Sequence, residues 1–202
     1  VMKIIVWNSQ DKCVADYHRL IRGCDVLCLL DCGQWTVPMY ALQIQKGLFH
    51  WKVEHEGLSY DIFYCLEKVA FVCRDGLYSG ESVLYSIHSN IGSLIGICLQ
   101  DDFWLFAHHE PNLVNAYHIG EFYLREISDH FRKAAFIADF KKKSYSWVQE
   151  TVGKLYCIAL PEGYYPHTVN YLFTIHVACT DLYLLEGYSE TSNQPTFFEL
   201  DI

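Results

Sequence analysis

The 202-residue chain is 51% hydrophobic and 16% aromatic, a composition that excludes a disordered chain because so much apolar side chain has to be buried. Its length fits one core, and we predict a single domain over residues 1–202. Lys and Arg number 15 against 24 Asp and Glu, and the formal net charge of -9 excludes a general attraction to phosphate backbones, so binding to a nucleic acid would need a local basic patch.

Two further patterns concern the environment of the chain. No stretch approaches the roughly 18 to 20 uninterrupted apolar residues that span a bilayer, so we expect no transmembrane segment and a signal peptide that is absent or already removed. The nine cysteines are an odd number and most lie in apolar, strand-like runs, which favours buried free thiols and a reducing compartment. Cys24, Cys28 and Cys32 recur every four residues, but in a strand residues four apart are separated by about 13 Å, too far for one zinc ion.

The first thirty residues predict a strand, a helix and a second strand. A β-branched run over residues 3–7 predicts the first strand, and apolar side chains at helical spacing over residues 14–21 predict a helix that Gly23 ends. The continuous apolar run over residues 25–30 is typical of a strand that is buried on both faces. Together these segments predict a βαβ unit.

The remainder predicts a meander of strands with a few helices. We expect helices over residues 35–47, 113–132 and 145–151, and the strands are predicted at 51–54, 60–66, 69–74, 82–88, 93–100, 103–108, 134–137, 155–159, 169–176 and 196–200. Two sheets packed face to face with helices outside accommodate this order best. We therefore predict an α/β fold, a four-layer α-β-β-α sandwich.

Polar residues at the ends of five of the predicted strands, taken in chain order, form a recognisable pattern. They are Asn8 after the first strand, Asp31 after the second, Arg74 at the end of 69–74, His108 at the end of 103–108, and Asp139 after 134–137. In order and spacing these segments resemble the DNase-I-like endonuclease/exonuclease/phosphatase superfamily, and most closely the catalytic B subunit of cytolethal distending toxins. The resemblance runs from one end of the chain to the other and implies the DNase-I-like fold.

The resemblance also implies a role for each of these residues. Asn8 would orient the metal-binding shell, and Asp31 would be the magnesium ligand, although the family has a Glu there. Arg74 would contact phosphate, His108 would act as a phosphate-contacting acid with His109 as an ambiguous neighbour, and Asp139 would hold the nucleophilic water. Three of them also have a structural interpretation, since Asn8 can start a turn, Asp139 can cap a helix or form a turn, and a lone His108 at a strand end is often a hydrogen-bonded core residue.

Three further positions depart from the family pattern. Lys141 stands where the family has an Asn, Asn170 stands where it has an Asp, and Gln194 stands where it has the catalytic His. Gln has no titratable nitrogen, so these replacements remove the group that takes a proton from water. The shorter Asp31 side chain weakens the binding of Mg²⁺, which requires close oxygen ligands. Lys141, Asn170 and Gln194 could still bind phosphate, helped by the basic run over residues 141–143.

We therefore predict a catalytically degenerate protein, a binding or toxin-complex subunit rather than an enzyme. The alternative is an active Mg²⁺-dependent phosphodiesterase, either a DNase or a phosphoinositide phosphatase, in which His167 or His176 replaces the missing base. The resemblance implies other toxin subunits or host proteins as partners, with DNA or a phosphoinositide as ligand. It also implies a secreted subunit that acts inside a host cell.

Overall fold

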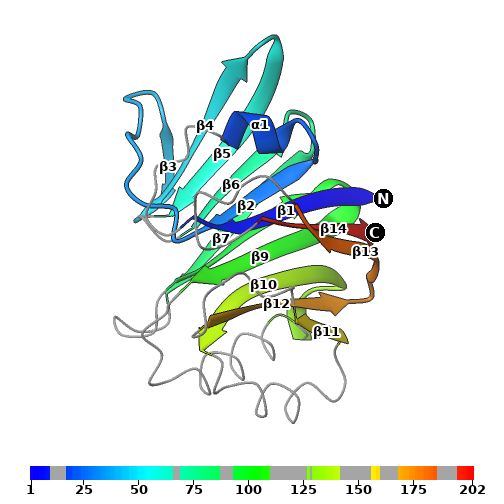
Figure 1. Ribbon diagram of the computed structural model, residues 1–202. Coiled ribbons are helices and arrows are strands. Elements are labelled where there is room, and N and C mark those ends of the chain that lie inside the picture. The colour runs from blue at the N-terminus through cyan, green and yellow to red at the C-terminus, as the bar shows by residue number, and fades with distance from the viewer. Residues whose placement is uncertain are drawn as a thin grey trace.

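The computed structural model describes residues 1–9, 17–65, 69–86, 93–109, 127, 129–141, 156–159, 168–185 and 195–202. Within these ranges the backbone alone is described at 83–86, 93, 139–141, 156–159 and 168–171. The described elements form two β-sheets packed face to face (Figure 1). This arrangement confirms the predicted pair of sheets.

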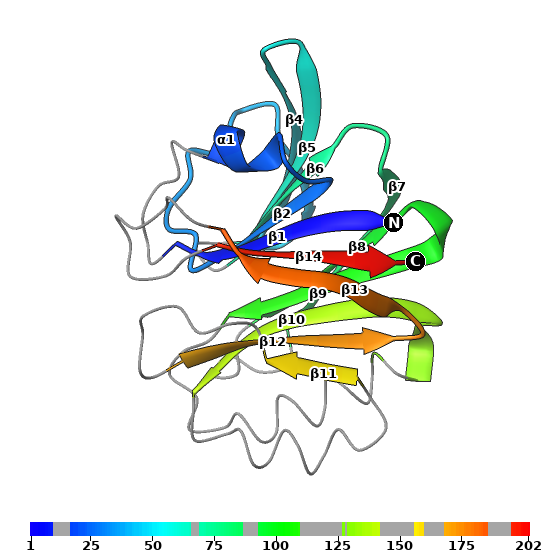
Figure 2. The same ribbon diagram turned by 45° about the vertical axis from the view of Figure 1, so that its right-hand side comes forward.

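The first sheet has eight strands and contains both ends of the described chain. Its order is β13 (Ala178–Leu184), β14 (Thr196–Asp201), β1 (Met2–Asn8), β2 (Val26–Leu30), β6 (Val69–Arg74), β5 (Leu58–Cys65), β4 (Leu48–His55) and β3 (Leu42–Gln45). β1 and β2 are parallel, and α1 (Tyr17–Ile21) lies between them in the chain and packs on the outer face of the sheet (Figure 2). The predicted βαβ unit is thus confirmed.

The second sheet has six strands. Its order is β11 (Tyr156–Ala159), β12 (Thr168–Ile175), β10 (Lys133–Lys141), β9 (Phe103–His109), β8 (Ser93–Leu99) and β7 (Tyr78–Ser86), with a short 3-10 helix, η1 (Gln100–Asp102), joining β8 to β9. β9 and β10 are parallel and occupy the middle of the sheet. Each sheet therefore carries one parallel pair near its centre.

The main core lies between the two sheets. Strand residues of alternating positions point into it, and its fully buried members include Ile4, Cys28 and Phe63 from the first sheet and Leu105 and Ile137 from the second. A second apolar cluster covers the outer face of β1 and β2 and packs under α1. β2 is buried along its whole length, because it has one of these clusters on each face.

Two predictions about elements need correction or completion. The helix predicted over residues 35–47 is wrong, because Pro38 has no N–H to donate and disfavours a helical residue before it, and the segment instead turns into the short strand β3. β13 was not predicted at all. The helices predicted over residues 113–132 and 145–151 fall almost entirely outside the described residues. Among the residues that are described, no helix is long and apolar enough to cross a membrane.

Candidate functional site

The carboxyl ends of the parallel strands bring polar side chains to one edge of the sandwich. Asn8 is the last residue of β1 and pairs in register with Leu30, the last residue of β2. Asp31 is the next residue in the chain. His109 ends β9 in the other sheet. The Nε2 atom of His109 lies 3.6 Å from the Oδ1 atom of Asp31. At this edge a polar side chain of the second sheet therefore lies next to a carboxylate that follows a strand of the first.

Burial differs strongly within this group. His109 is only 2% exposed and Asn8 only 6%, whereas the side chain of Asp31 is 36% exposed. The imidazole thus lies beneath the carboxylate, and the carboxylate faces solvent. A ligand that approached from solvent would meet Asp31 first.

The two neighbouring histidines of β9 lie on opposite faces of the strand. Leu105 and Ala107 belong to the core between the sheets, and His109 continues that alternation. His108 instead follows Phe106, whose ring packs against Phe131 on the other face of the sheet, with ring centroids 4.8 Å apart. The structure therefore places His109, and not His108, beside Asp31.

Backbone register locates Asp139 next to this group. In the parallel pair β9–β10, Asp139 is the register partner of His109, and in the antiparallel pair β10–β12 it is the partner of Asn170. Lys141 pairs with Thr168 two positions further along. Asp139, Asn170 and Lys141 thus lie on neighbouring strands at the same edge of the second sheet, while Gln194 lies outside the described residues.

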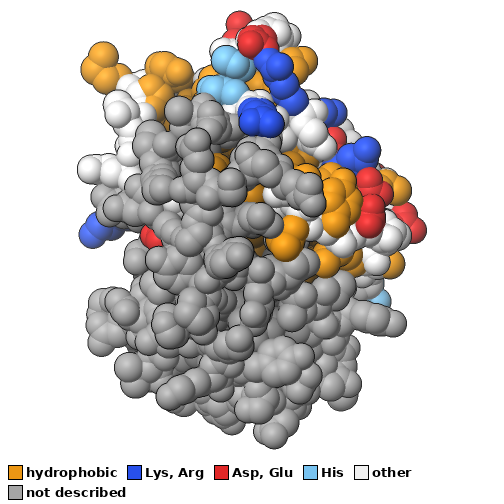
Figure 3. Space-filling view, in the orientation of Figure 1, with side chains coloured by type: hydrophobic (Ala, Val, Ile, Leu, Met, Phe, Trp, Pro, Cys, Tyr) orange, Lys and Arg blue, Asp and Glu red, His pale blue; other side chains and the backbone are white. Residues whose placement is uncertain are grey.

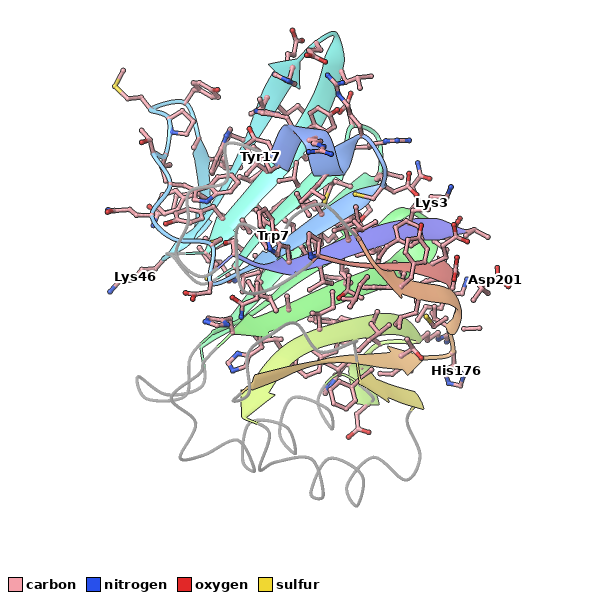
Figure 4. The ribbon with its side chains drawn as sticks, in the orientation of Figure 1. Lys3, Trp7, Tyr17, Lys46, His176 and Asp201 are labelled. Atoms are coloured by element: carbon pink, nitrogen blue, oxygen red, sulfur yellow. The ribbon has the colours of Figure 1, made fainter. Side chains whose placement is uncertain are left out.

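Arg74 and His176 lie elsewhere. Arg74 ends β6, which runs antiparallel to β2, and its Nη1 atom is 3.4 Å from Oδ1 of Asp25, the residue that precedes β2. Asp25 and Asp31 are six residues apart, or roughly 20 Å at the strand rise. His176, which is labelled in Figure 4, follows β12 at the end where Ile175 pairs with Ala134, five positions along β10 from Asp139. The structure does not bring Arg74 or His176 into the group around Asp31.

One residue that the sequence analysis did not consider belongs to the group. Ser9, which is fully buried, donates its hydroxyl to the backbone carbonyl of Asp31 at 3.1 Å, and its N–H donates to the carbonyl of Leu30 at 3.0 Å. Ser9 therefore ties the end of β1 to the turn that carries Asp31. Its position directly after Asn8 was the only available signal.

Comparison with known proteins identifies the architecture. No protein-family model and no curated protein matches the sequence, but solved structures match it over nearly its whole length. The 3'-5' exonuclease NExo from Neisseria meningitidis is 13% identical and has a TM-score of 0.63, with 100% of both chains covered. An endonuclease/exonuclease/phosphatase from Beutenbergia cavernae is 13% identical with a TM-score of 0.53, over 98% of this chain and 71% of that one. The protein has a DNase-I-like fold.

The DNase-I-like fold does not by itself decide the function. A Cimex nitrophorin, solved as its ferrous NO complex, is 10% identical and has a TM-score of 0.54, over 98% of this chain and 97% of the nitrophorin. Proteins as different as an exonuclease and a nitrophorin thus share the architecture. The function of this DNase-I-like protein therefore has to be argued from its own side chains.

The described donors supply part of the ligand set that a magnesium ion would need. At these strand ends they are the carboxylate of Asp31, the amide of Asn8 and the imidazole of His109. In proteins Mg²⁺ is usually held by one or two carboxylates and completes its nearly octahedral shell with waters and substrate phosphates, so the oxygens of Asp31 and Asn8 are ligands of a suitable kind. No group of three or more His, Cys, Asp and Glu side chains among the described residues is placed to hold any metal ion. In the described part of this DNase-I-like site, Asp31 would hold such an ion with help from the amide of Asn8, and the ion would supply polarisation of a phosphate oxygen.

Proposed function

We propose that this protein binds a phosphate ester at the strand ends around Asp31 and His109, and that it hydrolyses the ester poorly or not at all. The contact between these two side chains carries the proposal. A ring nitrogen of His109 lies 3.6 Å from the carboxylate of Asp31, and an N–H there would offset part of the negative potential that would otherwise repel a phosphate. The amide of Asn8 at the end of β1 adds hydrogen-bond donors at the same edge. A phosphate group could then be held without a metal ion.

Low turnover is proposed from the residues that depart from the family pattern. Hydrolysis requires a group that takes a proton from water, and the loss of such a base lowers the rate by roughly 10²- to 10⁴-fold. Gln194 cannot act as this base, Asn170 replaces a carboxylate, and Lys141 replaces an amide. These replacements affect one shared function, so their effects need not add.

The ligand is either DNA or the head group of a phosphoinositide. The net charge of -9 opposes long stretches of nucleic acid, so an isolated phosphate group or the end of a strand suits the site better than a long duplex. Among the structural neighbours, a 3' phosphatase from Neisseria was solved bound to a product DNA hairpin. A DNA hairpin and inositol trisphosphate are therefore the two probes to compare.

Binding and hydrolysis should be measured separately. We expect a fluorescent DNA hairpin or inositol trisphosphate to bind in the presence of EDTA, and His109→Gln to weaken this binding by about 10-fold because a charge-assisted contact is lost. His108→Gln is the matched control, since it removes a buried imidazole from the other face of the same strand. Equal affinities for His109→Gln and the unmodified protein would contradict the proposal.

An active metal-dependent hydrolase is the second candidate. One observation favours it: the imidazole of His109 lies beside the carboxylate of Asp31, and Asp139 is the backbone register partner of His109 in the pair β9–β10. Nicking of supercoiled plasmid with magnesium or manganese, lost in Asp139→Ala, would establish this candidate and remove the degenerate one. Absence of nicking together with binding in EDTA would remove the hydrolase and support the degenerate binding protein.

We further propose, from the sequence resemblance, that the chain is a secreted subunit of a toxin complex that partner subunits deliver into a host cell. The aromatic composition, with 15 Tyr and 5 Trp, suits protein contacts. Co-expression with lectin-like subunits and gel filtration would test this role. A chain that elutes alone in the presence of those subunits would count against it.

A further inference from the structure

The turn that carries Asp31 is held by an unusual set of hydrogen bonds. The backbone carbonyls of three consecutive residues each accept a hydrogen bond from a side chain. Ser9 Oγ donates to the carbonyl of Asp31 at 3.1 Å, Trp35 Nε1 to that of Cys32 at 2.9 Å, and the Tyr64 hydroxyl to that of Gly33 at 3.2 Å. These donors come from the end of β1, from the turn itself and from β5.

Tyr64 is the centre of this arrangement. Its hydroxyl donates to Gly33 and also accepts a hydrogen bond from the backbone N–H of Trp35 at 3.2 Å, so it bridges both sides of the turn. Its ring is 2% exposed and stacks on the indole of Trp35, with ring centroids 5.9 Å apart and an interplanar angle of 17°. Tyr17, which is labelled in Figure 4 at the start of α1, also stacks on Trp35, with ring centroids 5.6 Å apart.

The backbone of Asp31 has a conformation that needs such support. Its φ angle is +49°, in the left-handed region. This region is unfavourable for every residue except Gly, although less so for Asp and Asn. A residue in this region persists only where its surroundings fix it. The three held carbonyls are those of Asp31 and of the two residues after it, and they fix the turn and with it the direction in which the carboxylate leaves β2.

We propose that Tyr64 is a positioning residue for Asp31, acting together with Ser9 and Trp35. It does not touch the ligand. It holds the turn so that the carboxylate of Asp31 stays 3.6 Å from Nε2 of His109. This inference rests on the proposed phosphate-binding function and identifies what keeps that site in shape.

The test is Tyr64→Phe, which removes the hydroxyl and both of its hydrogen bonds while keeping the ring in the aromatic cluster. We expect binding of the DNA hairpin or inositol trisphosphate to weaken by about 10-fold, the loss that two buried hydrogen bonds would cause if they shape the site. Tyr60→Phe is the matched control, because Tyr60 is equally buried and lies on the same face of the same strand, four residues away. That control should bind as the unmodified protein does.

Two measurements separate positioning from general destabilisation. In an Asp31→Asn background, Tyr64→Phe should have no further effect on binding, because the group that it positions is already changed. The ¹³C chemical shifts of Asp31, which report its left-handed backbone, should move in Tyr64→Phe and stay in place in Tyr60→Phe. Unchanged shifts, or additive losses in the double variant, would overturn the inference.

The shift measurement needs no ligand, so the two ideas can fail separately. If the unmodified protein binds neither probe, the proposed function fails, and the positioning role is then decided by the shifts alone. If the unmodified protein binds and Tyr64→Phe binds equally well, the positioning role fails and the proposed function stands.

Discussion

The described core contains several buried cysteine thiols. Cys28 and Cys73 are fully buried, and desolvation raises the pKa of both well above its usual range; burial raises the pKa of Cys24 to about 12. The thiolate is the form that reacts with alkylating reagents, so these three thiols should be inert in the folded protein. We expect iodoacetamide to modify Cys179, which is partly exposed, while Cys28 and Cys73 stay unmodified until the protein is denatured.

Mass spectrometry of the digested protein resolves each cysteine in this experiment. The denatured sample is the internal control, since all of these peptides should then carry the label. Labelling of Cys28 at the rate of Cys179 under native conditions would mean that the core opens far more readily than its burial indicates.

The residues of the candidate site show what could be predicted at this scale. Asn8 and Asp31 were predicted from the resemblance, which puts them at strand ends, and the structure brings those ends together. To choose between His108 and His109 one must know which face of the strand each side chain points to, and two adjacent histidines in a sequence do not reveal this. Arg74 also ends a strand, but β6 runs antiparallel to β2, and strand direction was not available from the sequence.

Among the elements, α1 packs on the first sheet through its apolar residues and also contacts β4 through a pair of imidazoles. His18 of α1 and His55 of β4 stack with ring centroids 3.7 Å apart, and Arg22 pairs with Glu56 beside them. Figure 3 shows this gathering of His, basic and acidic side chains at the top of the view. Burial, then the nearby His55 and Arg22, lower the pKa of His18 from its usual value of 6.5.

The lowered pKa predicts how the docking of α1 depends on pH. The folded protein favours neutral His18, so its contribution to stability is complete above the unfolded pKa of 6.5 and is lost as the pH falls through the lower folded value. We expect the melting temperature to fall less on acidification in His18→Phe, which keeps a stacking ring that cannot be protonated. His176→Gln, at an exposed position, is the control. An equal fall in melting temperature with pH for His18→Phe and the unmodified protein would refute the prediction.

The elements that the sequence analysis missed have a common physical cause. β3 and β13 are the two edge strands of the first sheet, and most of their side chains are exposed or only partly buried. Strands in the middle of the sheet, such as β2 and β6, are buried on both faces and were predicted almost to the residue. Apolar runs thus reveal central strands, whereas an edge strand is specified by its neighbour, which a single sequence does not show.

At the scale of the whole molecule, the site exists only because the two sheets keep a fixed spacing. Asp31 belongs to the first sheet and His109 to the second, and their contact spans the layer between them. That layer is filled by fully buried side chains, among them Leu105 of β9. The same strand carries the equally buried Phe106, which faces away from the other sheet and packs against Phe131.

This pair of neighbours separates stability from the geometry of the site. Leu105→Ala should lower the free energy of unfolding by about 2 to 5 kcal/mol and Phe106→Ala by about 3 to 5 kcal/mol, because each leaves a cavity in a packed region. Only the cavity of Leu105→Ala lies between the sheets, where closing it would change their spacing. We therefore expect Leu105→Ala to weaken binding of the DNA hairpin or inositol trisphosphate well below the unfolding transition, and Phe106→Ala to leave it unchanged. Chemical denaturation gives the stability of each variant and fluorescence anisotropy its affinity. Loss of binding in proportion to stability in both variants would show that the site does not depend on the spacing of the sheets.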